Sequence, residues 1–320
     1  MSGSPRVAVV GASGFVGAAV VTALVRRGCE VQAVTAPRVP ALAPDAADGV
    51  VEREARAVQA LASLLEGATA VVNAAGMADA GAHDSAVLNG ANAGVPAVVA
   101  AAARTAGVAR VVHVSSAAVQ GRRRVLDESM QVEPFSPYSR SKALGELLAL
   151  RHGGDAVVIY RPPGVHGAGR ATTRSLAALA RSRLASVARP GTDPSPQALI
   201  DNVGDAVAFL VTCQEQPPRV VIHPWEGVTT AGLMRDLGGR APVMVPRWLA
   251  RLLVRSARLL GVAHPSLAAQ ARRLEMLWFG QAQADSWLTA AGWTARHGRA
   301  EWQELGRDAR PGGRAGSASA

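Results

Sequence analysis

The chain has 320 residues, of which 49% are hydrophobic and 18% are charged, a composition typical of a globular protein with a sizeable core. Its net charge of +10 comes from arginines that are spread along the chain, which argues against a nucleic-acid surface and leaves a small-molecule substrate as the expected partner. There is no apolar run of about 18 residues, no secretory signal and no disulfide framework, so we expect a cytoplasmic protein without an integral membrane segment.

The first predicted element is a short apolar strand, Arg6–Val10, which leads directly into a glycine-rich turn, Gly11–Gly17. An amphipathic helix pattern follows to about Arg27, and Gly28 is placed to end it. A strand, a glycine turn and a helix in this order place backbone N–H groups and a helix N-terminus against a pyrophosphate. The start of the chain therefore predicts a dinucleotide site.

The second predicted strand, Glu30–Val34, should end near the adenosine ribose of such a dinucleotide. Sites that prefer NAD commonly place a carboxylate there, which binds the 2′-hydroxyl. This chain has Thr35 instead, followed by Arg38, which could meet a 2′-phosphate or simply face solvent. We expect NAD or NADP as the cofactor, with NADP slightly favoured.

A third strand, Ala68–Val72, is predicted after a helix over residues 55–65, and it ends in the small-residue turn Asn73–Gly76. That turn leaves room for a flat ring. A long alanine-rich helix is expected from Asp84 to Arg104, where its small side chains permit close packing on a sheet.

A fourth strand, Arg110–Val114, runs into Ser115–Gly121, and a polar loop then leads to Tyr138. Lys142, the only lysine of the chain, follows that tyrosine by four residues, so a helix places both side chains on one face. A tyrosine has an ordinary pKa near ~10, and a nearby positive charge favours its phenolate. The pair can therefore act as a proton-transfer group, although a surface helix can also carry such a pair by chance.

A further strand, Ala156–Tyr160, precedes Arg161–Gly167, and the alternation of strands and helices up to this point predicts a parallel, doubly wound Rossmann-type sheet. We assign residues 1–167 to this NAD(P)-binding domain. Residues 168–305 are predicted to form a smaller, mostly helical substrate lobe, with a strand near 219–222 returning to the sheet. Residues 306–320 are predicted to be a disordered tail.

The substrate lobe contains tryptophans 248, 278, 287, 293 and 302, which we expect to form its core. Within it, Arg247–Leu260 is basic and amphipathic. Such a helix could lie on a membrane surface, but a helix that covers the substrate is the favoured interpretation. His83, His113 and His152 do not group with Cys29 and Cys213, so no metal site is predicted.

Five motifs together resemble the extended branch of the short-chain dehydrogenases/reductases, the epimerase/dehydratase family. They are Gly11–Gly17, Asn73–Gly76, Val114–Gly121, Pro137–Lys142 and Arg161–Gly167, in the family's order and at its distances. The resemblance covers roughly residues 6–170 and implies an NAD(P)-dependent enzyme that interconverts a secondary alcohol and a ketone. It also allows a homodimer.

The resemblance implies that Tyr138 is the general acid/base, that Lys142 holds the nicotinamide ribose and lowers the pKa of Tyr138, and that Ser116 binds the reacting oxygen. Glu54 falls where the family often has an acidic residue near the adenine. The residues expected at the cofactor are Gly11, Ser13, Gly14, Phe15, Val16, Gly17, Thr35, Arg38, Asn73, Ala74, Ala75, Gly76, Ser115, Tyr138, Lys142, Arg161, Pro162 and Val165. Those expected at the substrate are Asn92, His166, Arg170 and Arg174.

Three departures from the family's pattern concern the substrate. Gln120 and His166 each replace a common tyrosine, and Ala117-Ala118 supplies none of the carboxylates that sugar-nucleotide dehydratases use for elimination. A nucleotide-sugar 4-epimerase or reductase remains the favoured expectation, with Arg170 and Arg174 available for a diphosphate. The alternatives are a ketone reductase of the hydroxysteroid or flavonol type and a non-catalytic NAD(P)-binding sensor or scaffold.

Overall fold

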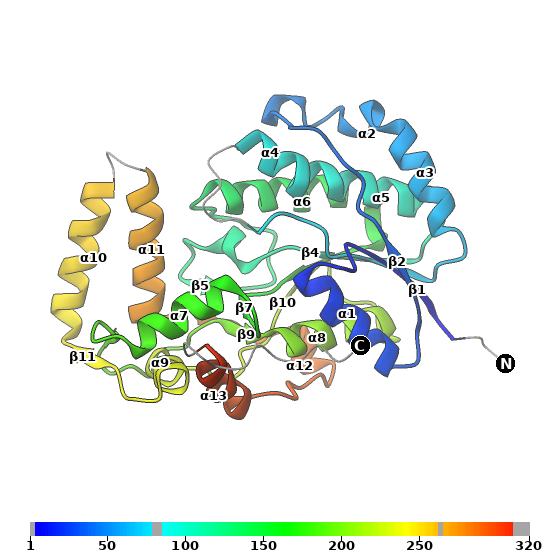
Figure 1. The fold of residues 1–320 in the computed structure, drawn as a ribbon. Coiled ribbons are helices and arrows are strands. Elements are labelled where there is room, and N and C mark those ends of the chain that lie inside the picture. The colour runs from blue at the N-terminus through cyan, green and yellow to red at the C-terminus, as the bar shows by residue number, and fades with distance from the viewer. Residues whose placement is uncertain (1–3, 79–84, 262–264, 310–320) are drawn as a thin grey trace.

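A six-stranded parallel sheet forms the centre of the computed structural model, which describes residues 4–78, 85–261 and 265–309 (Figure 1). In spatial order its strands are β10 (Val220–Ile222), β6 (Val157–Arg161), β4 (Arg110–Val114), β3 (Ala70–Asn73), β1 (Arg6–Val10) and β2 (Glu30–Val34). Every neighbouring pair is parallel. The predicted α/β, doubly wound class is confirmed.

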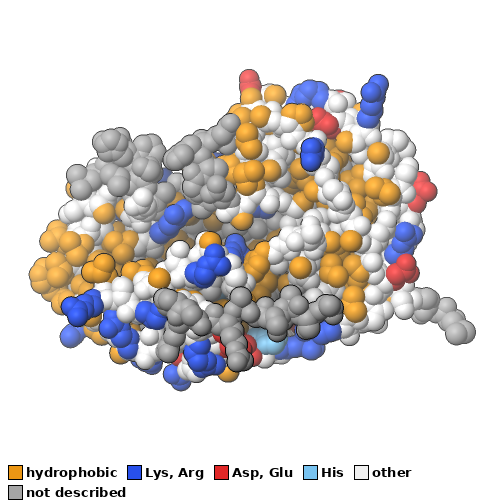
Figure 2. All heavy atoms as spheres, in the orientation of Figure 1, with side chains coloured by type: hydrophobic (Ala, Val, Ile, Leu, Met, Phe, Trp, Pro, Cys, Tyr) orange, Lys and Arg blue, Asp and Glu red, His pale blue; other side chains and the backbone are white. Residues whose placement is uncertain are grey.

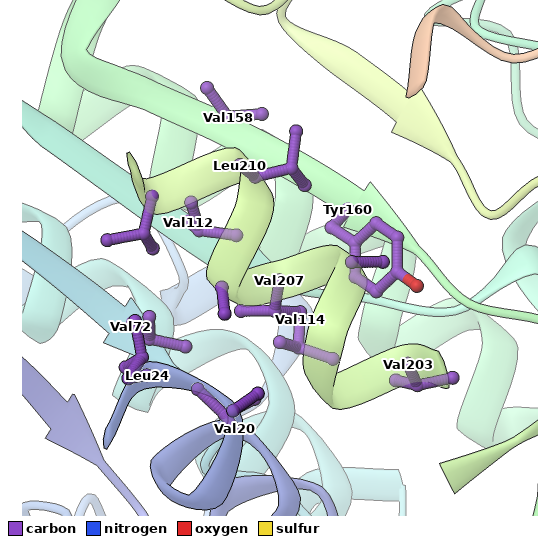
Figure 3. Close-up of a cluster of buried hydrophobic side chains, with 14 of the residues drawn as sticks. Val20, Leu24, Val72, Val112, Val114, Val158, Tyr160, Val203, Val207 and Leu210 are labelled. Atoms are coloured by element: carbon purple, nitrogen blue, oxygen red, sulfur yellow. The ribbon is translucent and has the colours of Figure 1, made fainter. Parts of the chain in front are cut away.

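Helices cover both faces of the sheet, which explains why its strands are almost continuous apolar runs. One layer holds α1 (Phe15–Arg26) and α8 (Ile200–Thr212), and the opposite layer holds α3 (Ala55–Leu65), α5 (Val95–Thr105) and α6 (Pro137–Gly153) (Figure 1). Figure 3 shows valines of the strands meeting the leucine and valine side chains of α1 and α8. Residues beyond 167 thus help to cover the sheet.

The order of the strands reverses between β1 and β3, and ligands of such sheets bind at this point, beyond the carboxyl ends of the strands. The two turns that follow β1 and β3 touch there. Gly11 has a φ of +82°, and a Cβ on it would lie 2.8 Å from the backbone nitrogen of Ala75. A Cβ on Gly17 would lie 2.0 Å from the carbonyl oxygen of Gly11. The glycine turn is therefore folded tightly onto the start of α1.

The predicted helix from Asp84 to Arg104 is interrupted, and Asp84 itself lies outside the described residues. The structure has α4 (Ser85–Asn89), a π-helical turn η2 (Gly90–Gly94) and then α5. This wide turn meets α6 closely, since a Cβ on Gly145 would lie only 2.0 Å from the carbonyl oxygen of Asn92. The stretch Ser85–Thr105 has the length and apolarity to cross a membrane, but 83% of its most apolar window is buried inside the fold, as in a core helix.

The remaining helices and strands build the lobe and the connections around the sheet. They are η1 (Pro44–Ala46), α2 (Val50–Arg53), η3 (Ala117–Gln120), β5 (Val125–Leu126), η4 (Gly154–Ala156), β7 (Gly164–His166), α7 (Ala171–Arg181), β8 (Ser186–Ala188), β9 (Gln197–Leu199), α9 (Thr230–Gly238), β11 (Val243–Val245), α10 (Arg247–Gly261), α11 (Pro265–Phe279), β12 (Ala282–Gln283), α12 (Trp287–Ala290) and α13 (Arg299–Asp308). Helices α10 and α11 form a hairpin at the left edge of the molecule in Figure 1.

Two expectations about the lobe need correction. Trp302 and Trp278 are buried in the lobe, but Trp293 packs in the core beneath the sheet and Trp248 is exposed on α10. The tail was expected from residue 306, yet α13 continues to Asp308 because Gly306 packs directly against α9. Residues 310–320 of that tail lie outside the described part of the chain.

The close approach at Gly17 generates a prediction. We expect Gly17→Ala to lower the free energy of unfolding by about 2–4 kcal/mol, because the added methyl group must displace backbone atoms of Gly11. Urea unfolding followed by circular dichroism measures this change. Gly14→Ala is the matched control, since its Cβ would lie 3.2 Å from the same oxygen, and we expect a loss below about 1 kcal/mol. Equal losses for the two variants would contradict the packing described.

Candidate active site

The first residues of helix α6 form a capped helix start. The Ser136 hydroxyl accepts a hydrogen bond from the Ser139 backbone at 3.1 Å, and Pro137 occupies the first turn, where no backbone N–H is needed. This start places Tyr138 and Lys142 on one face of the helix, toward the end of β4. The Lys142 ammonium is buried and donates a hydrogen bond to the carbonyl oxygen of Val114, the last residue of β4, at 3.2 Å.

Ser116 completes this group from the loop that follows β4. Its hydroxyl caps η3 by accepting from the Ala118 backbone at 3.2 Å, and it lowers the pKa of the neighbouring Tyr138 phenol. The structure therefore brings Ser116, Tyr138 and Lys142 together at the carboxyl edge of the sheet.

The electrostatics of the pair differ from the expectation. Burial raises the pKa of Tyr138, and the hydrogen bond from Ser116 and the charge of Arg170 oppose that rise only in part. Lys142 was expected to lower the pKa of Tyr138, but the cation that acts on the phenol in this structure is Arg170. Burial also lowers the pKa of Lys142 to about 8, against the opposing charge of Glu146.

Arg161 was expected at the cofactor, yet its guanidinium is fully buried within the protein. It donates to both carboxylate oxygens of Glu146, at 2.9 and 2.7 Å, and to the carbonyl oxygen of Ser129 at 2.8 Å. The Ser115 hydroxyl donates to the same carboxylate at 2.5 Å. Arg161 and Ser115 thus hold α6 against β6 and β4, and this polar cluster supports Lys142 from behind.

A cavity of about 340 Å³ opens in front of Ser116, Tyr138 and Lys142. The predicted site residues that line it are Val16, Ala74, Gly76, Ser115, Ser116, Tyr138, Lys142, Pro162, Val165, His166 and Arg170. Sequence reasoning missed the lining residues Met77, Leu126, Phe135, Gln197, Arg273, Met276 and Gln281, which lie on connecting loops, short strands or α11 and belong to none of the five motifs. The cavity wall is mainly apolar.

The other residues predicted for the substrate have different positions. His166 lines the cavity, but its two ring nitrogens are hydrogen-bonded to Gln197 and Thr173, and burial lowers its pKa to about 4, so the ring is neutral. Asn92 does not line the cavity, because its amide binds both backbone groups of Met77 and thereby fixes the loop after β3. Arg174 also lies outside the cavity and donates to a backbone carbonyl at 2.6 Å.

The turn after β1 has the form of a phosphate cradle. Gly14 caps α1 without any side-chain hydrogen bond, and Ser13 and Gly14 are exposed, so the N–H groups of the first turn face outward. Thr35 and Arg38 are exposed at the end of the neighbouring strand β2. These positions fit a dinucleotide whose adenosine end lies over β2.

Two further residues were expected near the dinucleotide, Asn73 and Glu54. The Asn73 amide donates to the ring of His113 at 3.2 Å, and its oxygen accepts from the Ala75 backbone, so the side chain shapes the turn. Glu54 lies between α2 and α3 rather than at the end of a sheet strand. Among residues 4–78, 85–261 and 265–309, no cluster of His, Cys, Asp or Glu forms a metal site.

The fold and the arrangement of the cavity agree with the family that the sequence matches. Residues 7–207 match the profile of the NAD dependent epimerase/dehydratase family. The chain belongs to this family. Its glycine cradle, its parallel sheet and the cavity at the end of β4 all lie within the matched residues 7–207 or directly against them.

Individual relatives add detail. A 4-hydroxy-2-methyl-3-oxo-4-farnesyl-3,4-dihydroquinoline-1-oxide ketoreductase from Stigmatella aurantiaca is 35% identical over 175 residues, which are 51% of each chain. The chain therefore spans about half the length of the curated relative it matches.

Solved structures of the same fold cover nearly the whole chain. Human epimerase family protein SDR39U1 with NADPH has a TM-score of 0.65 at 20% identity, over 94% of this chain and 99% of that one. MoeE5 in complex with UDP-glucuronic acid and NAD has a TM-score of 0.60 at 21% identity, over 95% and 100%. Both comparisons show that this chain has the fold of those structures.

The buried ammonium generates a prediction about stability. The pKa of Lys142 is about 8 in the folded protein and near 10.5 when the side chain is exposed. Below pH 8, burial of the charged ammonium therefore lowers the free energy of unfolding by about 3 kcal/mol. We expect Lys142→Met to raise the free energy of unfolding at pH 7 by about 1–3 kcal/mol, because the buried charge is removed while the carboxylate of Glu146 keeps Arg161 as its partner. The gain should shrink between pH 8 and 10.5, because the wild type then folds with a neutral amine.

Urea unfolding at several pH values measures this difference. Arg140→Met, an exposed position on the same helix, is the control and should change stability by less than about 0.5 kcal/mol. A Lys142→Met protein that is less stable than the wild type at pH 7 would show that the ammonium is a net stabiliser.

Proposed function

We propose that this protein is an NAD(P)-dependent reductase that converts a hydrophobic ketone into a secondary alcohol. The observation that carries the proposal is the grouping of Ser116, Tyr138 and the buried Lys142 around one mainly apolar cavity next to the glycine cradle. The two hydroxyls can grip one carbonyl oxygen in front of a bound nicotinamide.

The bound cofactor supplies the hydride to the carbonyl carbon. The protein's part is to orient the ketone and to neutralise the alkoxide that develops. Because its pKa is raised, the Tyr138 phenol is fully protonated at neutral pH and is ready to donate its proton to that oxygen. The guanidinium of Arg170, the cation that acts on the Tyr138 phenol, then stabilises the phenolate that remains. This protonation state favours the direction of reduction.

The lining of the cavity supports a hydrophobic substrate. Met77, Phe135 and Met276 approach it from three separate parts of the chain, and the prolines 162, 163 and 196 add further apolar surface. The relative from Stigmatella aurantiaca is named for a farnesyl-bearing ketone, which has the same character. The alanines at positions 117 and 118 leave no carboxylate beside Ser116, so an elimination step has no base.

A nucleotide-sugar epimerase or reductase is the second candidate. One observation favours it, namely that the guanidiniums of Arg170 and Arg273 both line the cavity, where they could bind a diphosphate. The two candidates separate by assay, because a nucleotide-sugar reductase consumes cofactor with sugar nucleotides and an epimerase converts them without a net redox change. Consumption of NADPH or NADH with farnesyl or aryl ketones, and none with sugar nucleotides, would select the first.

The proposed proton donor can be tested with the two tyrosines of the chain. We expect Tyr138→Phe to lower kcat by about 10²–10⁴-fold while cofactor affinity changes less than about threefold, because only the proton transfer is lost. Tyr160→Phe is the matched control. Its hydroxyl is hydrogen-bonded to His223 at 2.6 Å and lies outside the cavity, so kcat should be retained. Retained turnover in Tyr138→Phe would refute the assignment.

We further propose that the protein prefers NADP, because the exposed Arg38 stands at the end of β2 without a carboxylate beside it. Arg38→Gln should weaken NADPH binding by about tenfold and leave NADH binding within about twofold. Fluorescence titration with each nucleotide measures both constants. Arg56→Gln, another exposed arginine on α3, serves as the control, and an equal loss for NADPH and NADH would contradict the preference.

A further inference from the structure

Helix α10 has two apolar faces, of which only one is packed. On the inner face, Ala250 and Val254 are buried in a small core with Ala188 of β8 and Trp278 of α11. This core attaches the α10–α11 hairpin to the lobe. Packing of the inner face stabilises the hairpin, but it does not involve the apolar side chains on the opposite face of α10.

The outer face carries large apolar side chains in a line. Trp248, Leu252 and Leu259 are 69%, 54% and 74% exposed, and their spacing of four and seven residues places them on one side of the helix. We call these three residues the outer stripe. Figure 2 shows hydrophobic side chains gathered along the left edge of the molecule, where Figure 1 places α10. A stripe of this size on a surface helix indicates a contact with another apolar body.

A row of positive charge runs beside the outer stripe. Arg251, Arg255 and Arg258 follow one another at intervals of four and three residues, all exposed. Arg258 pairs with Glu275 of α11, whereas Arg251 and Arg255 make no ion pair with any described residue. Between Asp236 and Glu275 the sequence has no acidic residue, while it has seven arginines, at positions 240, 247, 251, 255, 258, 272 and 273.

We propose that the outer stripe and its arginine row dock this protein on an anionic phospholipid bilayer. Leucine and tryptophan side chains can enter the boundary between headgroups and acyl chains, and arginines beside them meet lipid phosphates. A second copy of the chain would have to bring Arg251 and Arg255 of both copies together, although neither makes an ion pair with any described residue. The charge therefore favours a lipid surface as the occupant.

The α10–α11 hairpin links the proposed membrane-docking surface to the cavity. Helix α11 contributes Met276 and Arg273 to the cavity, so the same hairpin that carries the outer stripe also forms part of the cavity wall. A protein bound through α10 would hold its cavity close to the bilayer, where a farnesyl-bearing or similarly lipophilic ketone resides. The docking surface rests on its own residues and does not depend on the proposed reaction.

Vesicle flotation with the full-length protein tests the proposal. Vesicles of phosphatidylcholine with about one third phosphatidylglycerol should carry the protein upward, and pure phosphatidylcholine should carry much less. Trp248→Ser/Leu252→Gln/Leu259→Gln should lower the partition coefficient at least about tenfold, through lost apolar burial. Arg251→Gln/Arg255→Gln should lower it about ten- to thirtyfold on anionic vesicles, and 0.5 M salt should do the same to the wild type.

Controls separate docking from folding and from self-association. Leu64→Gln/Arg56→Gln removes an exposed leucine and an exposed arginine from α3 and should leave flotation unchanged. Each variant should keep the wild-type melting temperature and NADPH affinity. Failure of the wild type to float, or equal flotation of the stripe variant, would overturn the proposal. A dimer seen by sedimentation that the stripe variant abolishes, without vesicle binding, would assign the surface to a second copy and also overturn it.

Discussion

The structure depends on the burial of one ammonium group, that of Lys142, between helix α6 and the end of strand β4. A charge in such a place is unfavourable unless polar atoms surround it. The carbonyl oxygen of Val114 accepts its hydrogen bond, and the carboxylate of Glu146, one turn along the helix, supplies the compensating charge. That carboxylate is itself buried and in turn requires Arg161 and Ser115. A single polar cluster thus joins β4, α6 and β6 directly behind the site.

The burial of Lys142 against β4 requires close packing around helix α6. For Lys142 to reach β4, the helix has to lie deep against the neighbouring segments, and Gly145 permits this because it has no side chain at its contact with the turn η2. The same turn carries Asn92, whose amide ties down Met77 and also donates to the Ser141 hydroxyl at 3.0 Å. The loop that borders the cavity after β3 is therefore positioned by the helix that carries Tyr138.

The parts that could be predicted from the sequence are those where local signals and burial agree. The strands Arg6–Val10 and Arg110–Val114 have the predicted bounds because the covered sheet makes each of them mainly apolar, and the edge strand Glu30–Val34 has them because Gly28 ends the preceding helix. The sequence could not show that Arg161 turns inward to pair with Glu146, since a motif does not show which way a side chain faces. The cavity residues Met276 and Gln281 come from the lobe, where tertiary packing rather than periodicity decides the structure.

The side chains that line the cavity carry positive charge, and this charge affects both the stability of the empty cavity and the proposed reduction. Its lining, as far as the described residues extend, includes three cations, Lys142, Arg170 and Arg273, and no carboxylate, while burial keeps His166 neutral. Positive charge in a mainly apolar cavity stabilises an anion that forms there more than it would in water. A ketone that accepts a hydride becomes such an anion at its oxygen, and the phenol of Tyr138 becomes one when it gives up its proton. Burial disfavours the charged forms of Lys142 and Arg170 in the empty cavity, whereas the same positive charges are favourable beside the anion that forms during reduction.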